Sequence, residues 1–308
     1  MAFLKLLESI RCPFLDTFFS LVTRLGEETV FIVVGILFFW CINKKEGYFL
    51  LSVGLIGTVI NQFLKLWFRI PRPWVKDPDF TIVESARAEA TGYSFPSGHT
   101  QNAVGIFGSI GRWNKGVLIR FLCILACVLV PLSRMYLGVH TPMDVGVSII
   151  IALVLVFGFY PIIKRCIEKP FGMRVLMLLM AAASIAFIVF LKRYDFPTNT
   201  NIRNLESGIE NGYKMLGCIV GLWISFEVDV RFTHFDTKAK WWAQVLKFLL
   251  GLLPVLAIKI FLKEPCNELC YKLFDDAFLG GALRYFFITI FAGCFWPMTF
   301  KFFKKLGN

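Results

Sequence analysis

The chain has 308 residues, of which 57% are hydrophobic and 18% charged, and its mean hydropathy is +0.67. A soluble globular domain carries about 45–50% apolar and about 25% charged residues, so this composition excludes an ordinary soluble protein. The formal net charge of +12 requires no nucleic-acid partner, because anionic lipid headgroups attract the same basic loops.

Apolar runs recur along the whole chain, and about 20 such residues suffice to cross a bilayer. Residues 13–26 are apolar but carry Asp16 and Arg24, which favours an amphipathic helix at the membrane interface. The predicted fold class is all-α, a polytopic membrane helical bundle with about nine transmembrane helices. Their predicted positions are residues 28–43, 48–68, 99–113, 117–137, 142–163, 172–192, 212–227, 242–262 and 280–301.

The charges between these runs predict the orientation of the chain. Basic residues concentrate in the connections that share a side with the C-terminus: Lys44, Lys45, Arg112, Lys115, Lys164, Arg165, Lys169, Arg174, Arg231, Lys238, Lys240, Lys301, Lys304 and Lys305. On the other side the basic residues are offset by acidic ones. The positive-inside rule therefore predicts a cytoplasmic C-terminus, with the long loop 69–98 outside.

The first motif of chemical interest is Lys65 followed by Arg72, at the end of the second predicted span. Pro71 and Pro73 flank Arg72, so the helix is expected to end here and to leave Arg72 on a fixed turn. A guanidinium binds two phosphate oxygens at once, whereas a lysine acts as a point charge. Basic residues also snorkel at span ends without any function, so this pair alone does not identify a site.

The second motif, Pro96-Ser97-Gly98-His99, precedes the third predicted span. An ordinary helix start would explain it, because serine caps helices and glycine turns the chain. The same features suit an anion, since free N–H groups at a helix N-terminus bind phosphate. Gly98 would let a phosphate approach the backbone closely, and His99 would stand ready to donate a proton.

The third motif is Ser133-Arg134, then His140, then Asp144. Thr141 suits a helix cap and Pro142 the first turn, so Asp144 could simply be a favourable partner of the helix dipole. An ionised aspartate four residues after a histidine can also accept its ring N–H. The other ring nitrogen is then free to attack.

All three motifs fall on the extracytoplasmic side of the predicted topology, which favours one shared site. They supply three cations, two histidines and one carboxylate, the groups needed to hold a phosphoryl group, attack it and protonate the leaving oxygen. Three cations around the phosphoryl oxygens can stabilise charge as magnesium does elsewhere. The cysteines and histidines show no metal-binding spacing. We therefore expect neither a metal nor another cofactor.

The motif set resembles the signature of the type 2 phosphatidic acid phosphatase superfamily, which also includes the vanadium haloperoxidases. The match covers residues 65–144. It implies a six-helix phosphatase core within residues 1–192, which also hold the amphipathic helix, and additional C-terminal transmembrane helices of unknown role in residues 193–308. By resemblance, His140 is the nucleophile that forms a phosphohistidine, Asp144 orients it, and His99 is the general acid. The residues that hold the phosphoryl group are then Lys65, Arg72, Arg134, Ser97 and Gly98.

A site at the membrane surface is reached naturally by a lipid whose tails stay in the bilayer, so the expected substrate is a lipid phosphate monoester or diphosphate. The expected partners are membrane lipids and that substrate, with no nucleic acid, in a bacterial plasma membrane; no oligomeric state is predicted. A soluble sugar phosphate, as for glucose-6-phosphatase, is the first alternative. A haloperoxidase and a non-enzymatic transporter or scaffold are the others. Aromatic residues near the motifs suit either a lipid entrance or a simple interfacial belt: Trp67, Trp74, Phe80, Tyr93 and Phe95.

The C-terminal part offers fewer signals. Cys266 and Cys270 share a predicted outer loop, where a disulfide is possible but not required by the spacing. Glu227 and Arg284 are ionisable groups in or near predicted spans, which marks them for attention, although snorkelling at span ends also accounts for them.

Overall fold

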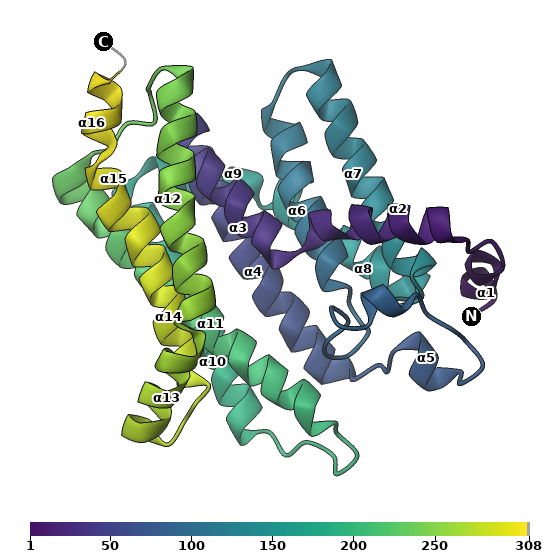
Figure 1. The fold of residues 1–308 in the computed structure, drawn as a ribbon. Helices are drawn as coiled ribbons and strands as arrows, with labels where there is room; N and C mark the ends of the chain where they lie inside the picture. The colour runs from purple at the N-terminus through teal and green to yellow at the C-terminus, as the bar shows by residue number, and fades with distance from the viewer. Residues whose placement is uncertain (307–308) are drawn as a thin grey trace. The chain divides into compact units, whose positions relative to one another are not determined.

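The computed structural model describes residues 1–306, and in that range the chain forms helices and no strands (Figure 1). The all-α prediction is confirmed. The first half contains α1 (Ala2–Ser9), α2 (Pro13–Thr23), η1 (Arg24–Gly26), α3 (Glu28–Leu37), η2 (Phe38–Ile42), α4 (Lys44–Phe68), α5 (Pro73–Lys76), η3 (Glu84–Ala86), α6 (Gly98–Trp113) and α7 (Val117–Tyr136). The second half contains α8 (Pro142–Leu153), η4 (Val154–Gly158), α9 (Tyr160–Glu168), α10 (Pro170–Arg193), α11 (Ile202–Val228), η5 (Asp229–Thr233), α12 (Trp241–Phe261), α13 (Lys263–Phe274), α14 (Leu279–Ile290), η6 (Phe291–Phe295), α15 (Trp296–Met298) and α16 (Phe300–Lys305).

Five helical segments of the described chain are long and apolar enough to cross a membrane: Lys44–Lys76, Val117–Tyr136, Pro170–Arg193, Trp241–Phe261 and Leu279–Met298. Two bent pairs raise the number to seven if each pair is one span, with bends of 52° at α2–α3 and 46° at α8–α9. This is an integral membrane protein, but the predicted count of nine spans is not confirmed. The 16 residues of α6 reach only about 24 Å, less than the apolar thickness of a bilayer. In α11 polar residues, including Lys214, interrupt the apolar stretch.

The chain divides into two compact units, each built from separate stretches of sequence. The first consists of Met1–Ile32, Ile56–Pro161 and Asp195–Gly208, and it holds every residue of the three motifs. Within it α6 packs against α7 and α8, while α1 and α2 pack against α7 (Figure 1). The helix predicted at residues 13–26 is therefore present as α2 and η1.

The long loop between α4 and α6 is packed inside the first unit. One core cluster joins Ala86 to Tyr136, Leu137 and Val139, with Trp74 against it. A second joins Phe80 and Ile82 of the loop to Leu4 of α1. Phe80, Tyr93 and Phe95 are buried, whereas Trp67 is 47% exposed. Most of the aromatic residues near the motifs thus fix the loop, and only Trp67 is well placed to meet lipid.

The second unit consists of Val33–Leu55, Ile162–Tyr194 and the chain from Ile209 onward. Within it α13 packs on α14, and α12 packs on α13, α14 and α16. Residues 263–279, predicted as an outer loop, are mostly the helix α13, because Pro265 falls in its first turn, where proline is tolerated. Cys266 and Cys270 are buried free thiols.

Candidate active site

The segment between α4 and α5 positions the first two cations. α4 ends at Phe68, and Arg72 becomes the N-cap residue of α5, as the flanking prolines predict. Lys65, in the last turn of α4, is buried and its Nζ donates to the carbonyl of Tyr93 at 2.6 Å. The side chain therefore reaches across to the segment that leads into α6.

Carbonyl groups fix the Arg72 guanidinium from three directions. Its Nε donates to Gly92 at 3.2 Å, its Nη2 to Thr91 at 2.7 Å and its Nη1 to Val139 at 2.9 Å. Gly92 has a φ of +70°, a backbone conformation that glycine adopts readily. Because carbonyls carry no net charge, they orient the cation without neutralising it.

The start of α6 has the geometry expected of an anion-binding helix N-terminus. The Ser97 hydroxyl accepts from Thr100 N at 3.4 Å, so the predicted cap is present, and Ser97 N donates to the Asp144 carbonyl at 3.2 Å. A Cβ added at Gly98 would meet a single protein atom within 4 Å, Asn61 Oδ1 at 3.9 Å. Packing against the protein therefore does not demand glycine here, and the space beside the backbone is left for a ligand.

The turn between α7 and α8 carries the remaining groups. Arg134 is fully buried, its Nη1 donates to Thr23 Oγ1 at 2.7 Å, and its Nε and Nη2 have no hydrogen-bond partner. Its carbonyl accepts from the backbone N–H groups of Val139 and His140, which holds the turn. Thr141 caps the start of α8, as predicted, and it forms a capping box together with Asp144.

His140 lies between a guanidinium and a carboxylate. Its Nε2 is 2.9 Å from Arg72 Nη1, and since a guanidinium only donates, Nε2 must be the acceptor. The neutral ring therefore carries its proton on Nδ1, which is 3.7 Å from Asp144 Oδ2. That distance is too long for a hydrogen bond, so the bond predicted between these two residues is not formed.

Other groups hold the Asp144 carboxylate. Its Oδ2 accepts from Ser94 Oγ at 2.6 Å and from Thr141 N at 2.7 Å. Burial is the main cause that lowers the pKa of His140 well below its ordinary value, followed by the cations Arg72 and Arg134. The imidazole is thus kept neutral, the form in which a nitrogen can act as a nucleophile.

The charges of this site are unbalanced. Lys65, Arg72 and Arg134 are each at most 7% exposed, and the only carboxylate among the eight motif residues is Asp144, which is fully buried. Two positive charges are therefore left over among these groups, and burying unpaired charge is costly. A phosphate dianion has the complementary charge. His99, half-buried with its Nε2 unpartnered, completes the set.

Sequence reasoning missed three contributors to this site. Ser94 bonds Asp144 from 50 residues away, and Thr23 bonds Arg134 from 111 residues away. Asn61, one turn before Lys65 on α4, faces Gly98. Asn61 could have been found from the sequence, because it lies four residues before Lys65 and so on the same face of the helix. The residues next to Ser94 and Thr23 in the sequence give no sign of their partners. Within residues 1–306, no three His, Cys, Asp or Glu side chains gather closely enough to hold a metal ion.

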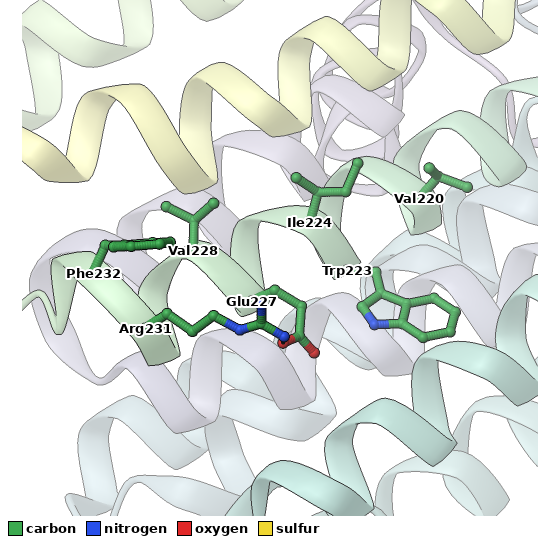
Figure 2. A pocket seen from close by; sticks show the side chains of 7 residues that line it. All are labelled: Val220, Trp223, Ile224, Glu227, Val228, Arg231 and Phe232. Atoms are coloured by element: carbon green, nitrogen blue, oxygen red, sulfur yellow. The ribbon is translucent and has the colours of Figure 1, made fainter.

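A groove lies wholly within the second unit. The groove has a volume of about 330 Å³. Figure 2 shows the side chains that line it along α11 and η5: Val220, Trp223, Ile224, Glu227, Val228, Arg231 and Phe232. Glu227 accepts from Arg174 at 2.6 and 3.0 Å and from Arg231 at 3.0 Å. Glu227 is thus a partner in an ion-pair network, and no motif residue lines this groove.

Comparison with protein families gives two matches. Residues 45–168 match the PAP2 superfamily, and residues 213–307 match the PAP2 superfamily phosphatase, transmembrane extension. The first match includes the eight motif residues that form the candidate site. The two matches together cover most of the chain.

Similar curated proteins are lipid phosphatases by name. A probable sphingosine-1-phosphate phosphatase of Dictyostelium discoideum is 33% identical over 160 residues, 48% of this chain and 38% of that protein. Phosphatidylglycerophosphatase B of Bacillus subtilis is 28% identical over 52% of this chain and 82% of its own length. The undecaprenyl-diphosphatase BcrC of Bacillus subtilis is 35% identical over 38% and 58%. The chain thus spans less than two thirds of the first and third of these relatives.

A similar solved structure is the crystal structure of LpxE from Aquifex aeolicus. It is 28% identical and covers 50% of this chain and 90% of that chain, with a TM-score of 0.45.

Proposed function

The chain belongs to the PAP2 superfamily, and from that premise we propose that it is an integral-membrane, metal-independent phosphatase of a lipid phosphate monoester or diphosphate. The observation that carries the proposal is the buried excess of cations around a neutral histidine. Lys65, Arg72 and Arg134 surround His140, whose Nε2 lies 2.9 Å from a guanidinium nitrogen. Phosphoryl transfer depends mainly on positioning and charge stabilisation, which such an arrangement supplies.

In the proposed first step, His140 Nε2 attacks the phosphorus while the bond from phosphorus to the leaving oxygen breaks. Burial, Arg134, Arg72 and Lys65 lower the pKa of His99, and the negative charge of the bound phosphate offsets these cations so that His99 can carry the proton. The leaving oxygen takes that proton, and the products are a phosphohistidine and an alcohol, or a lipid monophosphate where the substrate is a diphosphate. The three cations, the Ser97 hydroxyl and the backbone N–H of Gly98 stabilise the charge on the phosphoryl oxygens. The new imidazolium keeps its proton on Nδ1, which faces the Asp144 carboxylate.

In the proposed second step, a water molecule attacks the phosphohistidine. His99, now neutral, accepts a proton from this water, the bond between nitrogen and phosphorus breaks, and inorganic phosphate leaves. The same residue therefore serves as an acid and then as a base. Ser94 and Thr141 hold the Asp144 carboxylate throughout, so the nucleophile returns to one orientation.

A lipid phosphate is favoured over a soluble sugar phosphate by two observations. The similar proteins are named for sphingosine 1-phosphate, phosphatidylglycerophosphate and undecaprenyl diphosphate, which are all lipids. The lysine of the site lies in the last turn of a membrane-spanning helix, two residues before the exposed Trp67. A headgroup can enter there while its tails stay in the bilayer.

We also propose an orientation of the chain in the membrane and separate roles for its two parts. The basic connections predict a cytoplasmic C-terminus and an extracytoplasmic active site. The membrane of the proposal is a bacterial plasma membrane. Residues 1–192 would carry catalysis, and residues 193–308 would form the additional membrane helices. Hydrolysis of an impermeant phosphate ester by intact cells tests the orientation, because only an outward-facing site reaches that substrate.

The direct test of the function is phosphate release by the detergent-purified protein from a panel of lipid and soluble phosphates in the presence of EDTA. We expect release from at least one lipid phosphate, little from glucose 6-phosphate, and background release by His140→Ala. Activity that EDTA abolishes, or that survives in His140→Ala, would contradict the proposal. Halide oxidation with added vanadate is the control for a haloperoxidase.

A further inference from the structure

One face of α4 runs alongside the segment that enters α6. Gly57, Asn61 and Lys65 are four residues apart and share this face. A Cβ at Gly57 would lie 2.9 Å from Gln101 Nε2, Asn61 faces Gly98, and Lys65 donates to the carbonyl of Tyr93. Along this face, Gly57, Asn61 and Lys65 therefore lie against residues 101, 98 and 93 in that order. Asn61 is the middle one and lies beside the proposed phosphate.

Asn61 is buried without a partner. It is 2% exposed, and neither its Nδ2 nor its Oδ1 has a hydrogen-bond partner. Thr100 Oγ1 and Gln101 Oε1, in the first turn of α6, are likewise buried and unpaired. Folded proteins pair nearly all their buried polar groups, so a cluster of unpaired ones calls for an explanation. Its position against the open side of Gly98 indicates a ligand.

We propose that Asn61 and the first turn of α6 form a further oxyanion-binding subsite. The Asn61 amide, whose Oδ1 faces Gly98 in this structure, turns over on binding, so that Nδ2 donates to a phosphoryl oxygen seated over Gly98. This inference rests on the proposed function. A carboxamide adds a donor without adding charge, which suits a site that already holds three cations. The oxygen over Gly98 would be held by Asn61 together with the helix N–H groups, while the arginines hold the others.

The test uses the full-length purified protein with orthovanadate as a phosphate analogue, and compares Asn61→Leu and Asn61→Asp. Vanadate affinity is measured by inhibition and by thermal stabilisation, beside KM and kcat. A lost hydrogen bond to a charged ligand predicts that Asn61→Leu weakens vanadate binding about 10- to 100-fold. Asn61→Asp should weaken it further, because its carboxylate repels the anion. Ser109→Ala, a buried hydroxyl of α6 bonded within its own helix to Gly105, is the control and should bind as the wild type does.

The opposite ranking of the vanadate affinities of the two variants would contradict the proposed subsite. If Asn61 only holds an ordered water or supports packing, the isosteric Asn61→Asp should stay close to the wild type, and Asn61→Leu should change only the unfolding temperature. Wild-type vanadate affinity in both variants, or no vanadate binding by the wild type, would also refute it. A wild-type protein that binds vanadate but hydrolyses no lipid phosphate would refute the proposed function instead and leave this comparison intact.

Discussion

At the scale of single residues, Arg72 and Asp144 determine which ring nitrogen of His140 carries the proton. Arg72 donates to Nε2, so the ring proton sits on Nδ1 and faces Asp144. In this geometry Nε2, the nitrogen proposed to attack, already faces the cation that would hold the phosphate. The Asp144 carboxylate lies on the Nδ1 side of the ring, near the positive charge that a phosphohistidine would carry. Burial and cations together favour the neutral imidazole.

The first prediction concerns the protonation of this ring. Because its pKa is lowered, His140 should remain neutral as the pH falls through 6.5, and should gain a proton only well below that value. Nuclear magnetic resonance of the protein labelled with ¹⁵N-histidine measures this directly. The chain has three histidines, and the His140→Asn spectrum identifies the signal that belongs to His140. Titration at or above the pKa of a free histidine peptide would contradict the described environment.

The second prediction separates His99 from His140 by the leaving group. A general acid contributes about 10²–10⁴-fold when the leaving oxygen needs a proton, and little when it does not. His99→Ala should therefore lose about 10²–10⁴-fold in kcat/KM with an alkyl lipid phosphate, but much less with a nitrophenyl phosphate.

Steady-state hydrolysis of both esters provides the measurement. His140→Ala is the matched comparison and should be inactive towards both, because the nucleophile is needed whatever the leaving group. Equal losses of His99→Ala on the two esters would show that His99 is not the acid.

At the scale of elements, three helix ends converge: the C-terminal end of α4, the start of α6, and the turn from α7 into α8. Their caps could be predicted, because Ser97 and Thr141 act on groups three residues away. The break of α4 before Arg72 was also predictable from the prolines around it. The bonds from Ser94 to Asp144 and from Thr23 to Arg134 could not be predicted, because they depend on tertiary contacts.

The third prediction concerns η1, in which Gly26 packs against the backbone of His99. A Cβ at Gly26 would lie 2.6 Å from the His99 carbonyl, so Gly26→Ala must displace either η1 or the start of α6. We expect a loss of about 1–3 kcal/mol in stability and a lower kcat.

Gly146→Ala in α8 is the control, because a Cβ there meets nothing within 4 Å. Its helix should gain up to about 1 kcal/mol. Thermal unfolding and phosphate release by both variants test the pair, and a Gly26→Ala protein that matches the wild type would contradict this packing.

At the scale of the whole molecule, the groups of the candidate site gather in one compact unit, while the second unit is held by close helix packing. Gly217 and Gly221 on α11 face Ala282 and Thr289 of α14 so closely that a side chain would collide with them. Small residues at helix contacts are the usual means of packing in membranes. The number of spans was hard to predict from apolar runs alone, because α6 is too short and α11 too interrupted by polar residues to count as spans, and two other predicted spans belong to bent helix pairs.

The fourth prediction tests that packing. Gly217→Ala places a methyl group against the Ala282 backbone and should lower stability by about 1–3 kcal/mol. Gly281→Ala on α14 is the control, because its Cβ would meet Lys214 at an ordinary 3.4 Å. Unfolding temperatures in one detergent compare the two. Equal unfolding temperatures would show that α11 and α14 are not packed as described.

We propose above all that Lys65, Arg72 and Arg134 hold a phosphoryl group for attack by His140. Trapping the phosphorylated enzyme tests this most directly. His99→Ala is mixed with a ³²P-labelled nitrophenyl phosphate, so that phosphoryl transfer to the enzyme proceeds while hydrolysis of the intermediate is slowed. We expect about one label per chain, stable in base and labile in acid as phosphohistidine is, and no label in the double variant that also carries His140→Ala. Label that persists without His140, or that never appears while phosphate is released, would contradict the proposal.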